Sequence, residues 1–371
     1  MSHKIIVMSL KSALAFAVAS MAVPLMASPM SPAISASSLV ARQSDEGPIG
    51  DGPCMAGVGI QQITWFGERP SYRRDGQKIA FMSKSFGDAY EIDLRTQRLK
   101  LLTGWPHAGF LRAQYLVNGD IFLIGAREFK DVVETRDKDM EMWVLTPGDR
   151  FARPLNHKIF EGVAISIYSN KISWSNGHGQ YPDEFEEGET AMYVGDIDYS
   201  EGEPKIINKK EVARAMAPEC TLEPQDFFNN DTEIIFTCYS THPTNHYGNV
   251  QTVNIETGER TMLRDVEGEY NEVEGIYPNE KYVLVESAWS RKGNNTPSVQ
   301  GVEIYKMGME PNSTVWQRLT WFSSTKPWKA GNPVVSPDGR TMAVHSSRGD
   351  QQAGVGYGLY LVDLEVDADG E

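Results

Sequence analysis

One pattern of apolar and polar positions recurs six times along the chain. In each copy a mostly apolar strand reaches a short polar turn, and a strand rich in β-branched and aromatic residues follows. The turns read PDG, RDG, PNE, NND, NG or SN, which are residues that tolerate tight-turn dihedral angles. The copies are RPSYRRDGQKIAFMSKS (69–85), QYLVNGDIFLIGAR (114–127), ISIYSNKISWSNG (165–177), QDFFNNDTEIIFTCYS (225–240), EGIYPNEKYVLVESAW (274–289) and NPVVSPDGRTMAVHSSR (332–348).

Each copy continues into a third strand, and most continue into a fourth. The third strands read AYEIDL, EMWVL, AMYVGDI, NVQTVNI, VEIYKM and GLYLVDL, and the fourth strands include RLKLLT, RTMLR and WQRLTW. Turns recur about every 43 to 60 residues. Four-stranded units at this period are typical of β-propeller blades. A β-sandwich of short strands would not explain why the same turn recurs at the same place, so the sequence predicts an all-β, six-bladed β-propeller.

The sixth unit lacks its own fourth strand, and the N-terminal part of the domain supplies a candidate. GIQQITWFGERP (59–70) repeats the pattern of WQRLTWFSSTKP (316–327), which is the fourth strand of the fifth unit with its exit into the next unit. We therefore expect the strand in 59–70 to complete the last blade and to shorten its exposed edge. On this basis residues 55–366 form a single propeller domain.

The first residues predict a targeting segment outside the fold. A basic start, MSHK, precedes the apolar run IIVMSLKSALAFAVASMAVPLM, and small residues suit cleavage near residue 22 or as late as residue 27. A membrane anchor is the alternative, but Lys11 interrupts the run and Pro24 ends it. We expect residues 1–22 to be a signal peptide and 28–54 to be a disordered linker or pro-segment. The mature chain is then secreted, with no membrane association after signal removal.

The charge of the chain excludes one class of partner. The formal net charge is −15 with histidine neutral, whereas a protein that tracks a nucleic-acid backbone needs a basic face. Nucleic acid is therefore not an expected partner. An anionic polysaccharide remains open as a substrate, provided that a local basic groove exists.

Three cysteines and three glycosylation motifs bear on secretion. Cys220 and Cys238 lie nearly symmetrically about the turn at Asn229 and Asn230, so a hairpin there would place them almost opposite each other. A disulfide and a pair of buried thiols both remain possible. The third cysteine is Cys54. The candidate N-glycosylation sites are Asn230, Asn294 and Asn312.

The repeat resembles the TolB-type, PD40 propeller family, whose blades carry an SPDG turn. Ser336 to Gly339 matches this turn in full, and 74–76 and 278–279 match in part. A narrower resemblance attaches to NEVEGIYPNEKYVLVE (271–286) and KAGNPVVSPDGRTMAVHSSRGDQQAGVGYGLYLVDL (329–364). These stretches resemble secreted, mostly fungal propellers that include the hetero-Diels–Alderases of tropolone–sesquiterpene pathways. The resemblance supplies no catalytic motif that can be transferred residue by residue.

The candidate site follows from the propeller topology. Loops between blades and loops joining second to third strands share one face, around the mouth of the central channel, where ligand-sized sites belong. These loops are rich in aromatic and polar residues, and Trp174 is one of them. The expected catalytic residues are His345, Arg348, His246 and Tyr247, and the expected substrate-binding residues are Trp65, Trp289, Trp328, Tyr357 and His242.

Each of these residues also has a structural interpretation. Tryptophans at blade exits commonly pack between blades, His345 is equally suited to a buried structural role, and Arg348 can pair with Asp350 or Asp338. Glu272 and Glu274 begin an inner strand and either point into the channel or are solvated. His242 and His246 have a metal-like spacing but no evident third ligand, so no metal or other cofactor is expected.

Three functions follow as hypotheses. The chain carries no GxSxG, HExxH, P-loop or paired CxxC motif. The resemblance implies a cofactor-independent cyclase that couples a tropolone quinone methide to a humulene-type sesquiterpene, with small molecules as its partners. The alternatives are a non-catalytic TolB-like binding propeller and a metal-dependent lyase of acidic polysaccharides. The lyase requires that His242, His246 and His345 converge with Gln351 or Gln352.

Overall fold

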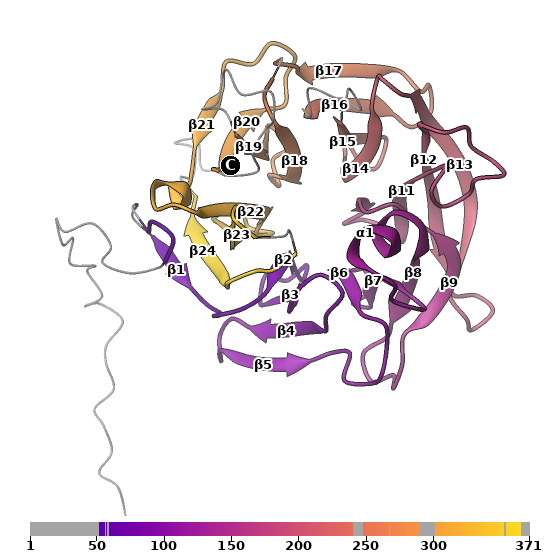
Figure 1. Ribbon diagram of the computed structural model, residues 1–371, viewed down its shortest axis with the longest axis horizontal. Helices are drawn as coiled ribbons and strands as arrows, with labels where there is room; N and C mark the ends of the chain where they lie inside the picture. The colour runs from indigo at the N-terminus through magenta and orange to yellow at the C-terminus, as the bar shows by residue number, and fades with distance from the viewer. Residues whose placement is uncertain are drawn as a thin grey trace, which may run out of the picture. The chain divides into compact units, whose positions relative to one another are not determined.

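The computed structural model describes residues 52–55, 57, 59–239, 248–266, 268–288, 301–351 and 354–364, and these residues form six four-stranded antiparallel sheets around a central axis (Figure 1). The expected signal peptide and all but the last residues of the expected linker lie outside the described residues. Within the part that is described, no helix is long and apolar enough to cross a membrane. The prediction of an all-β, six-bladed propeller is confirmed.

Each sheet is one blade, and strand order within it follows the chain except in the sixth. The first blade holds β2 (Glu68–Tyr72), β3 (Lys78–Met82), β4 (Ala89–Asp93) and β5 (Arg98–Leu101). The second holds β6 (Phe110–Tyr115), β7 (Ile121–Ala126), β8 (Met140–Leu145) and β9 (Arg153–Lys158). The third holds β10 (Val163–Ile165), β11 (Lys171–Gly177), β12 (Glu189–Asp198) and β13 (Lys205–Met216).

The other three blades follow the same plan. The fourth holds β14 (Thr221–Phe228), β15 (Glu233–Tyr239), β16 (Gly248–Asn254) and β17 (Arg260–Arg264). The fifth holds β18 (Asn271–Ile276), β19 (Tyr282–Ser287), β20 (Glu303–Gly308) and β21 (Trp316–Arg318). The sixth holds β22 (Trp328–Val335), β23 (Thr341–Arg348), β24 (Leu359–Asp363) and β1 (Ile60–Gln62). Three short helical turns are α1 (Val132–Glu134), η1 (Thr135–Asp139) and η2 (Phe322–Ser324).

The N-terminal strand completes the sixth blade, as the sequence predicts. β1 pairs antiparallel with β24, with Ile60 opposite Val362. Beyond the strand, the backbone N–H of Leu359 donates a hydrogen bond to Thr64 Oγ1 at 2.8 Å. The two ends of the domain are therefore joined in one sheet, which covers the edge that β24 would otherwise expose.

Burial changes from the inside of a blade to its outside. Every residue of β7 is buried, because both faces of a second strand pack against neighbouring blades, whereas all four residues of the outer strand β5 are exposed. The apolar core lies between the blades: Phe122 of the second blade and Trp174 of the third belong to one cluster. Trp174 is 0% exposed, so its expected place in the channel mouth is wrong. Its strand continues into the core further than the sequence pattern indicates.

The inner strands share an irregularity at the same height. Five of the six contain a β-bulge, which shifts the register and breaks the simple alternation of side chains. Two bulge residues, Arg69 and Asn332, have positive φ angles of 55° and 44°. Because a bulge re-aims the side chains around it, polar residues that follow one another along an inner strand can both reach the channel.

The first two strands of the fourth blade are joined by a disulfide. Cys220 and Cys238 are bonded, with their Cα atoms 5.2 Å apart and both residues buried. Cys54 is free. Among the glycosylation candidates, Asn230 and Asn312 lie in exposed turns with positive φ, and Asn294 lies outside the described residues. Glycosylation stays a prediction.

Removing the disulfide is expected to destabilise the domain. The bond closes a loop of 18 residues, and the chain-entropy model assigns a bridge of this length about 3 kcal/mol. The double substitution Cys220→Ser, Cys238→Ser should lower the free energy of urea-induced unfolding by that amount. Cys54→Ser is the matched control and should leave it unchanged. Equal stability of the double variant and the wild type would contradict this prediction.

Candidate functional site in the central channel

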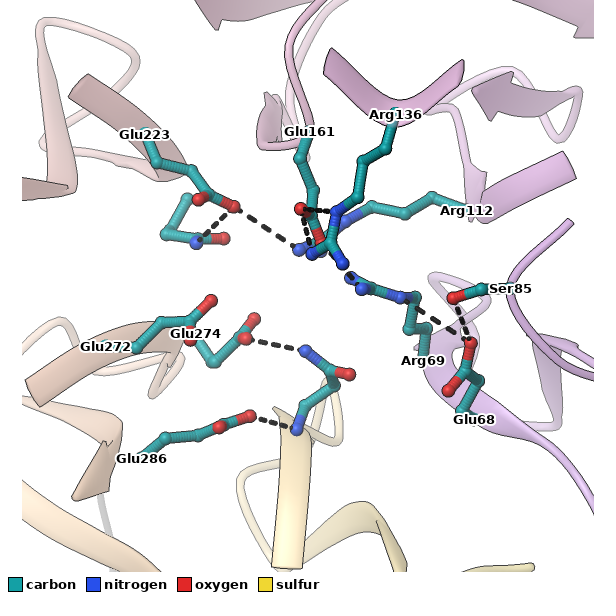
Figure 2. Close-up of polar contacts among 12 residues, drawn as sticks. Glu68, Arg69, Ser85, Arg112, Arg136, Glu161, Glu223, Glu272, Glu274 and Glu286 are labelled. Carbon is teal, nitrogen blue, oxygen red and sulfur yellow. Dashed lines mark hydrogen bonds and ion pairs between the residues drawn. The ribbon is translucent and has the colours of Figure 1, made fainter. Parts of the chain in front are cut away.

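Charged side chains from seven parts of the chain converge on the axis of the propeller, and Figure 2 shows them together with Ser85, which follows β3. Inner strands supply most of the group, because their bulges turn consecutive residues inward. The remaining members come from η1, from the link before β10 and from β19. The labelled group is Glu68, Arg69, Ser85, Arg112, Arg136, Glu161, Glu223, Glu272, Glu274 and Glu286.

Glu161 is the anchor of the basic side of this channel. Its Oε1 accepts a hydrogen bond from Arg69 Nη2 at 2.6 Å, and its Oε2 accepts from Arg136. Burial by itself would raise the pKa of Glu161, but the guanidinium groups of Arg136, Arg69 and Arg112 outweigh it and lower the pKa to about 2. Glu161 is therefore held as a carboxylate between the almost fully buried Arg69 and the partly exposed Arg136.

The opposite side of the channel carries carboxyl groups held in their neutral form. Oxygens of Glu272, Glu274 and Glu286 lie within 4.8 Å of one another. Burial, and then repulsion from Glu272, raises the pKa of Glu286 to about 8 and that of Glu274 well above its usual range. Burial and the neighbouring Glu161 do the same for Glu223. The channel therefore has one anionic group buried among arginines and a separate group of protonated acids.

Asn332 connects two of these acids. Its side-chain Nδ2 donates a hydrogen bond to Glu274 Oε1 at 2.8 Å, and its backbone N–H donates to Glu286 Oε1. Both bonds depend on the β22 bulge, because the positive φ of Asn332 turns its N–H and its side chain toward the same side of the channel.

A small cavity of about 60 Å³ lies between the basic and the acidic sides. A space of this size holds a few water molecules or a small polar group. Two guanidinium-bearing residues face Glu274 across it, and amide side chains complete the polar part of its wall. The lining residues are Arg69, Pro70, Ser71, Arg112, Gln114, Gln225, Glu274, Asn332, Pro333 and Val334.

Two sets of described residues have the composition of a cation site. The trio Glu272, Glu274 and Glu286 offers oxygen ligands of the kind that Ca²⁺ or Mg²⁺ takes. A second set includes Cys220 and Cys238, whose sulfur atoms are used in the disulfide.

His345 lies beside the acidic trio. It is 5% exposed, and its ring packs over Gly331, where a Cβ atom would approach the ring at 2.8 Å and Glu286 Oε1 at 3.5 Å. Burial, and then the positive charges of Arg69 and Lys329, lowers the pKa of His345 to about 3. The imidazole is therefore neutral at physiological pH and cannot act there as a proton donor in cationic form.

Three other expected site residues gather at the end of the sixth blade. Trp328 stands opposite Arg348 in the β22–β23 register, and the guanidinium lies 5.4 Å from the indole centroid. Trp328 also meets Tyr357 edge to face at 5.2 Å. Arg348 forms two hydrogen bonds to Asp350, at 3.0 and 2.9 Å, so the pairing with Asp350 that the sequence left open is present.

Of the remaining expected residues, Trp65 is described and four lie outside the described part of the chain. Trp65 is 82% exposed, which does not fit the wall of an enclosed site built from described residues. His242, His246, Tyr247 and Trp289 lie outside the described residues, as does Gln352. The histidine convergence that a polysaccharide lyase requires is therefore not tested.

Sequence reasoning missed most of the channel group. It noted Glu272 and Glu274 but left them between the channel and solvent, and it did not single out Arg69, Arg112, Arg136, Glu161, Glu223 or Glu286. The available signal was weak: the innermost strands of four blades each carry at least one charged residue, as in Arg69, Arg112, Glu223 and Glu272.

Comparison with known proteins identifies the fold. No family model matches the chain, and no curated protein does. Among solved structures, regucalcin from Agrobacterium tumefaciens, described as a calcium-binding protein, has 11% identity and a TM-score of 0.50 over 82% of this chain and 94% of its own. A putative TolB from the same bacterium has 13% identity and a TM-score of 0.48, over 74% and 97%. An oligogalacturonate lyase in complex with manganese has 12% identity and a TM-score of 0.47, over 82% and 93%.

At such identities the likeness concerns the fold and not the activity. The sheet order and the closure of the sixth blade identify the chain as an all-β, six-bladed β-propeller, and a putative TolB is among the solved structures that it resembles.

Proposed function

We propose that this chain is a secreted, cofactor-independent cyclase in which a neutral carboxyl group in the central channel assists the departure of water. The observation that carries the proposal is Glu274: it lines the cavity, its pKa is raised well above the usual range by burial and by Glu272, and it faces two guanidinium-bearing residues. A proton donor opposite fixed positive charge is the arrangement that a dehydration next to a carbonyl needs.

The chemistry requires only proton movement. In a hydroxymethyl-tropolone, the C–O bond of the hydroxymethyl group breaks as Glu274 transfers its proton to the departing oxygen, and water leaves. The ring hydroxyl loses its proton, which restores the acid, and the product is an electron-poor heterodiene. An alkene of a humulene-type sesquiterpene then adds across it, forming one C–C and one C–O bond of a dihydropyran. The reaction gains from holding both partners in a reactive orientation.

The substrates come from the resemblance of 271–286 and 329–364 to hetero-Diels–Alderase-like propellers. Two features of the site agree with that assignment. Tyr357 presents aromatic surface at the end of the sixth blade, where it packs against the buried Trp328, and Arg348 lies above the indole. The carboxyl groups point into the channel (Figure 2).

Glu274→Gln should lower kcat by about 10²-fold, because the amide keeps the shape and the hydrogen bond from Asn332 but has no proton to transfer. The assay incubates purified protein with a tropolone methide precursor and humulenol and quantifies the adduct against a boiled control. The wild-type rate should fall on the alkaline side as Glu274 ionises. Glu256→Gln, at an exposed position with a side chain 91% accessible, is the matched control and should retain full activity. Absence of any wild-type adduct would remove the cyclase function.

A non-catalytic binding propeller is the second candidate, and the cavity size favours it. A volume of about 60 Å³ admits a small polar group but not a whole sesquiterpene. A binding propeller would hold a small ligand in the channel without turnover. It would therefore give saturable binding and no adduct in the same assay, whereas the cyclase gives both.

A further inference from the structure

Arg112 lines the central cavity and has an unused hydrogen-bonding edge. The residue is 5% exposed, and among the described residues neither its Nε nor its Nη2 has a hydrogen-bond partner. Its nearest ionic neighbour is Glu223, whose Oε1 lies 3.6 Å from Nη2, too far for a hydrogen bond. Leaving buried charged donors without hydrogen bonds costs free energy. We therefore expect a ligand to supply an acceptor at this edge.

The two nitrogens define the shape of that acceptor. Nε–H and one Nη2–H lie on the same edge of the planar guanidinium and point in parallel, which matches two oxygens held side by side in one plane. A carboxylate has this geometry, and so does deprotonated tropolone. A chloride ion or a single carbonyl oxygen would have to be shared by both donors, through bent hydrogen bonds.

The protein's own carboxyl groups do not meet this demand. Glu161 is already bound by Arg69 and Arg136. Glu274, across the cavity, accepts from Asn332, and burial and Glu272 raise its pKa well above the usual range. Glu223 is likewise kept neutral by burial and by Glu161. Neutral acids around the cavity leave the charge of Arg112 uncompensated on that side.

The rest of the wall fits the same ligand. Gln114 Oε1 is a second buried atom without a hydrogen-bond partner among the described residues, and it lines the same cavity. It can accept from a hydroxyl or a water molecule that accompanies the anion. A cavity of about 60 Å³ suits a group of the size of acetate.

We propose that the cavity is an anion subsite in which the Nε–Nη2 edge of Arg112 binds both oxygens of a planar two-oxygen anion. The inference rests on the proposed function and deepens it by stating how the two oxygens of a substrate are held. If the protein is a binding propeller instead, the same subsite defines the class of its ligand. Its test is a binding measurement that needs no turnover. Failure of the subsite and failure of the cyclase are therefore separate results.

Acetate and tropolone are the probes, each titrated into wild-type protein at pH 7 and constant ionic strength maintained with chloride. A saturable rise in Tm of about 2 °C at ten times Kd is expected for a ligand of the native state. Saturation by acetate indicates a site for free organic acids, and saturation by tropolone alone indicates a site shaped for the ring of the proposed substrate. No saturable effect of either probe overturns the proposal, as does stabilisation by Ca²⁺ alone.

Arg112→Lys tests the edge itself, because lysine keeps the charge but loses the two parallel donors. It should weaken binding by at least about 10-fold. Arg73→Lys, an exposed residue paired with Asp75, is the control and should bind as the wild type does. Binding that is unchanged in Arg112→Lys places the anion elsewhere and refutes the assignment. If that variant does not fold, Gln114→Leu together with the wild-type titration decides, since loss of the second polar atom must weaken binding at this cavity.

Discussion

Glu161→Gln should lower the free energy of unfolding by about 3–5 kcal/mol, the cost of breaking a buried ion pair by removing one partner. Glu161 is the carboxylate that Arg69 and Arg136 share inside the channel. The amide keeps the size of the side chain but leaves two guanidinium groups without their counter-charge, and Arg69 is almost fully buried. Urea-induced unfolding at pH 7 measures the loss.

The control for this experiment removes an ion pair at the surface. Asp75 pairs with Arg73 at 2.6 Å, and both side chains are substantially exposed. Asp75→Asn should cost less than about 1 kcal/mol, because solvent screens the pair. A loss at Glu161 no larger than the loss at Asp75 would mean that the channel arginines are solvated in the native protein.

Glu286→Gln should flatten the decline of stability with rising pH. The folded pKa of Glu286 is raised from 4.5 to about 8 by burial and by Glu272. A raised pKa means that the native state holds the proton more tightly than the unfolded state does. The resulting stability is therefore complete below pH 4.5 and is lost as the pH rises through about 8. The amide cannot ionise, so the variant should retain about 4 kcal/mol more stability than the wild type above pH 8.

Glu161 makes the stability of the protein depend on pH in the opposite direction. Its pKa is lowered to about 2, so its contribution is present above pH 4.5 and is lost as the pH falls toward 2. Unfolding measured from pH 3 to pH 9 should show an acid limb that is reduced in Glu161→Gln and an alkaline limb that is reduced in Glu286→Gln. Glu256→Gln should keep both limbs. A wild-type stability that is constant from pH 5 to pH 9 would refute the neutral state of the channel acids.

The sequence alone determined the architecture, because the signals for it are local and repeated. The turn residues between the first two strands recur in each unit. The apolar pattern of each strand indicates whether one face or both faces of the strand are buried. Even the closure, which joins residues nearly three hundred positions apart, was visible, since 59–70 and 316–327 share a pattern. The proximity of Cys220 and Cys238 followed from their positions about one hairpin turn, whereas the bond between them was one of two alternatives that the sequence left open.

The candidate site was only partly accessible in this way. The positions of His345, Trp328, Arg348 and Tyr357 near one end of the sixth blade follow from strand order. The neutral state of His345 does not, because its pKa depends on burial and on Arg69 from another blade. The exposure of Trp65 also depends on how its loop packs, which no local pattern states.

Only the tertiary structure decided the chemistry of the channel. Arg112, Gln225 and Glu274 lie on three different blades, so nothing in the sequence says that they face one cavity. Bulges in the inner strands break the alternation by which a strand's inward residues are predicted. Which acids ionise is decided by distance and burial: Glu161 lies among arginines and stays charged, while Glu274 lies among acids and stays neutral. Both residues are glutamates in the same channel, and their surroundings alone make Glu161 a charged ion-pair partner and Glu274 a neutral acid.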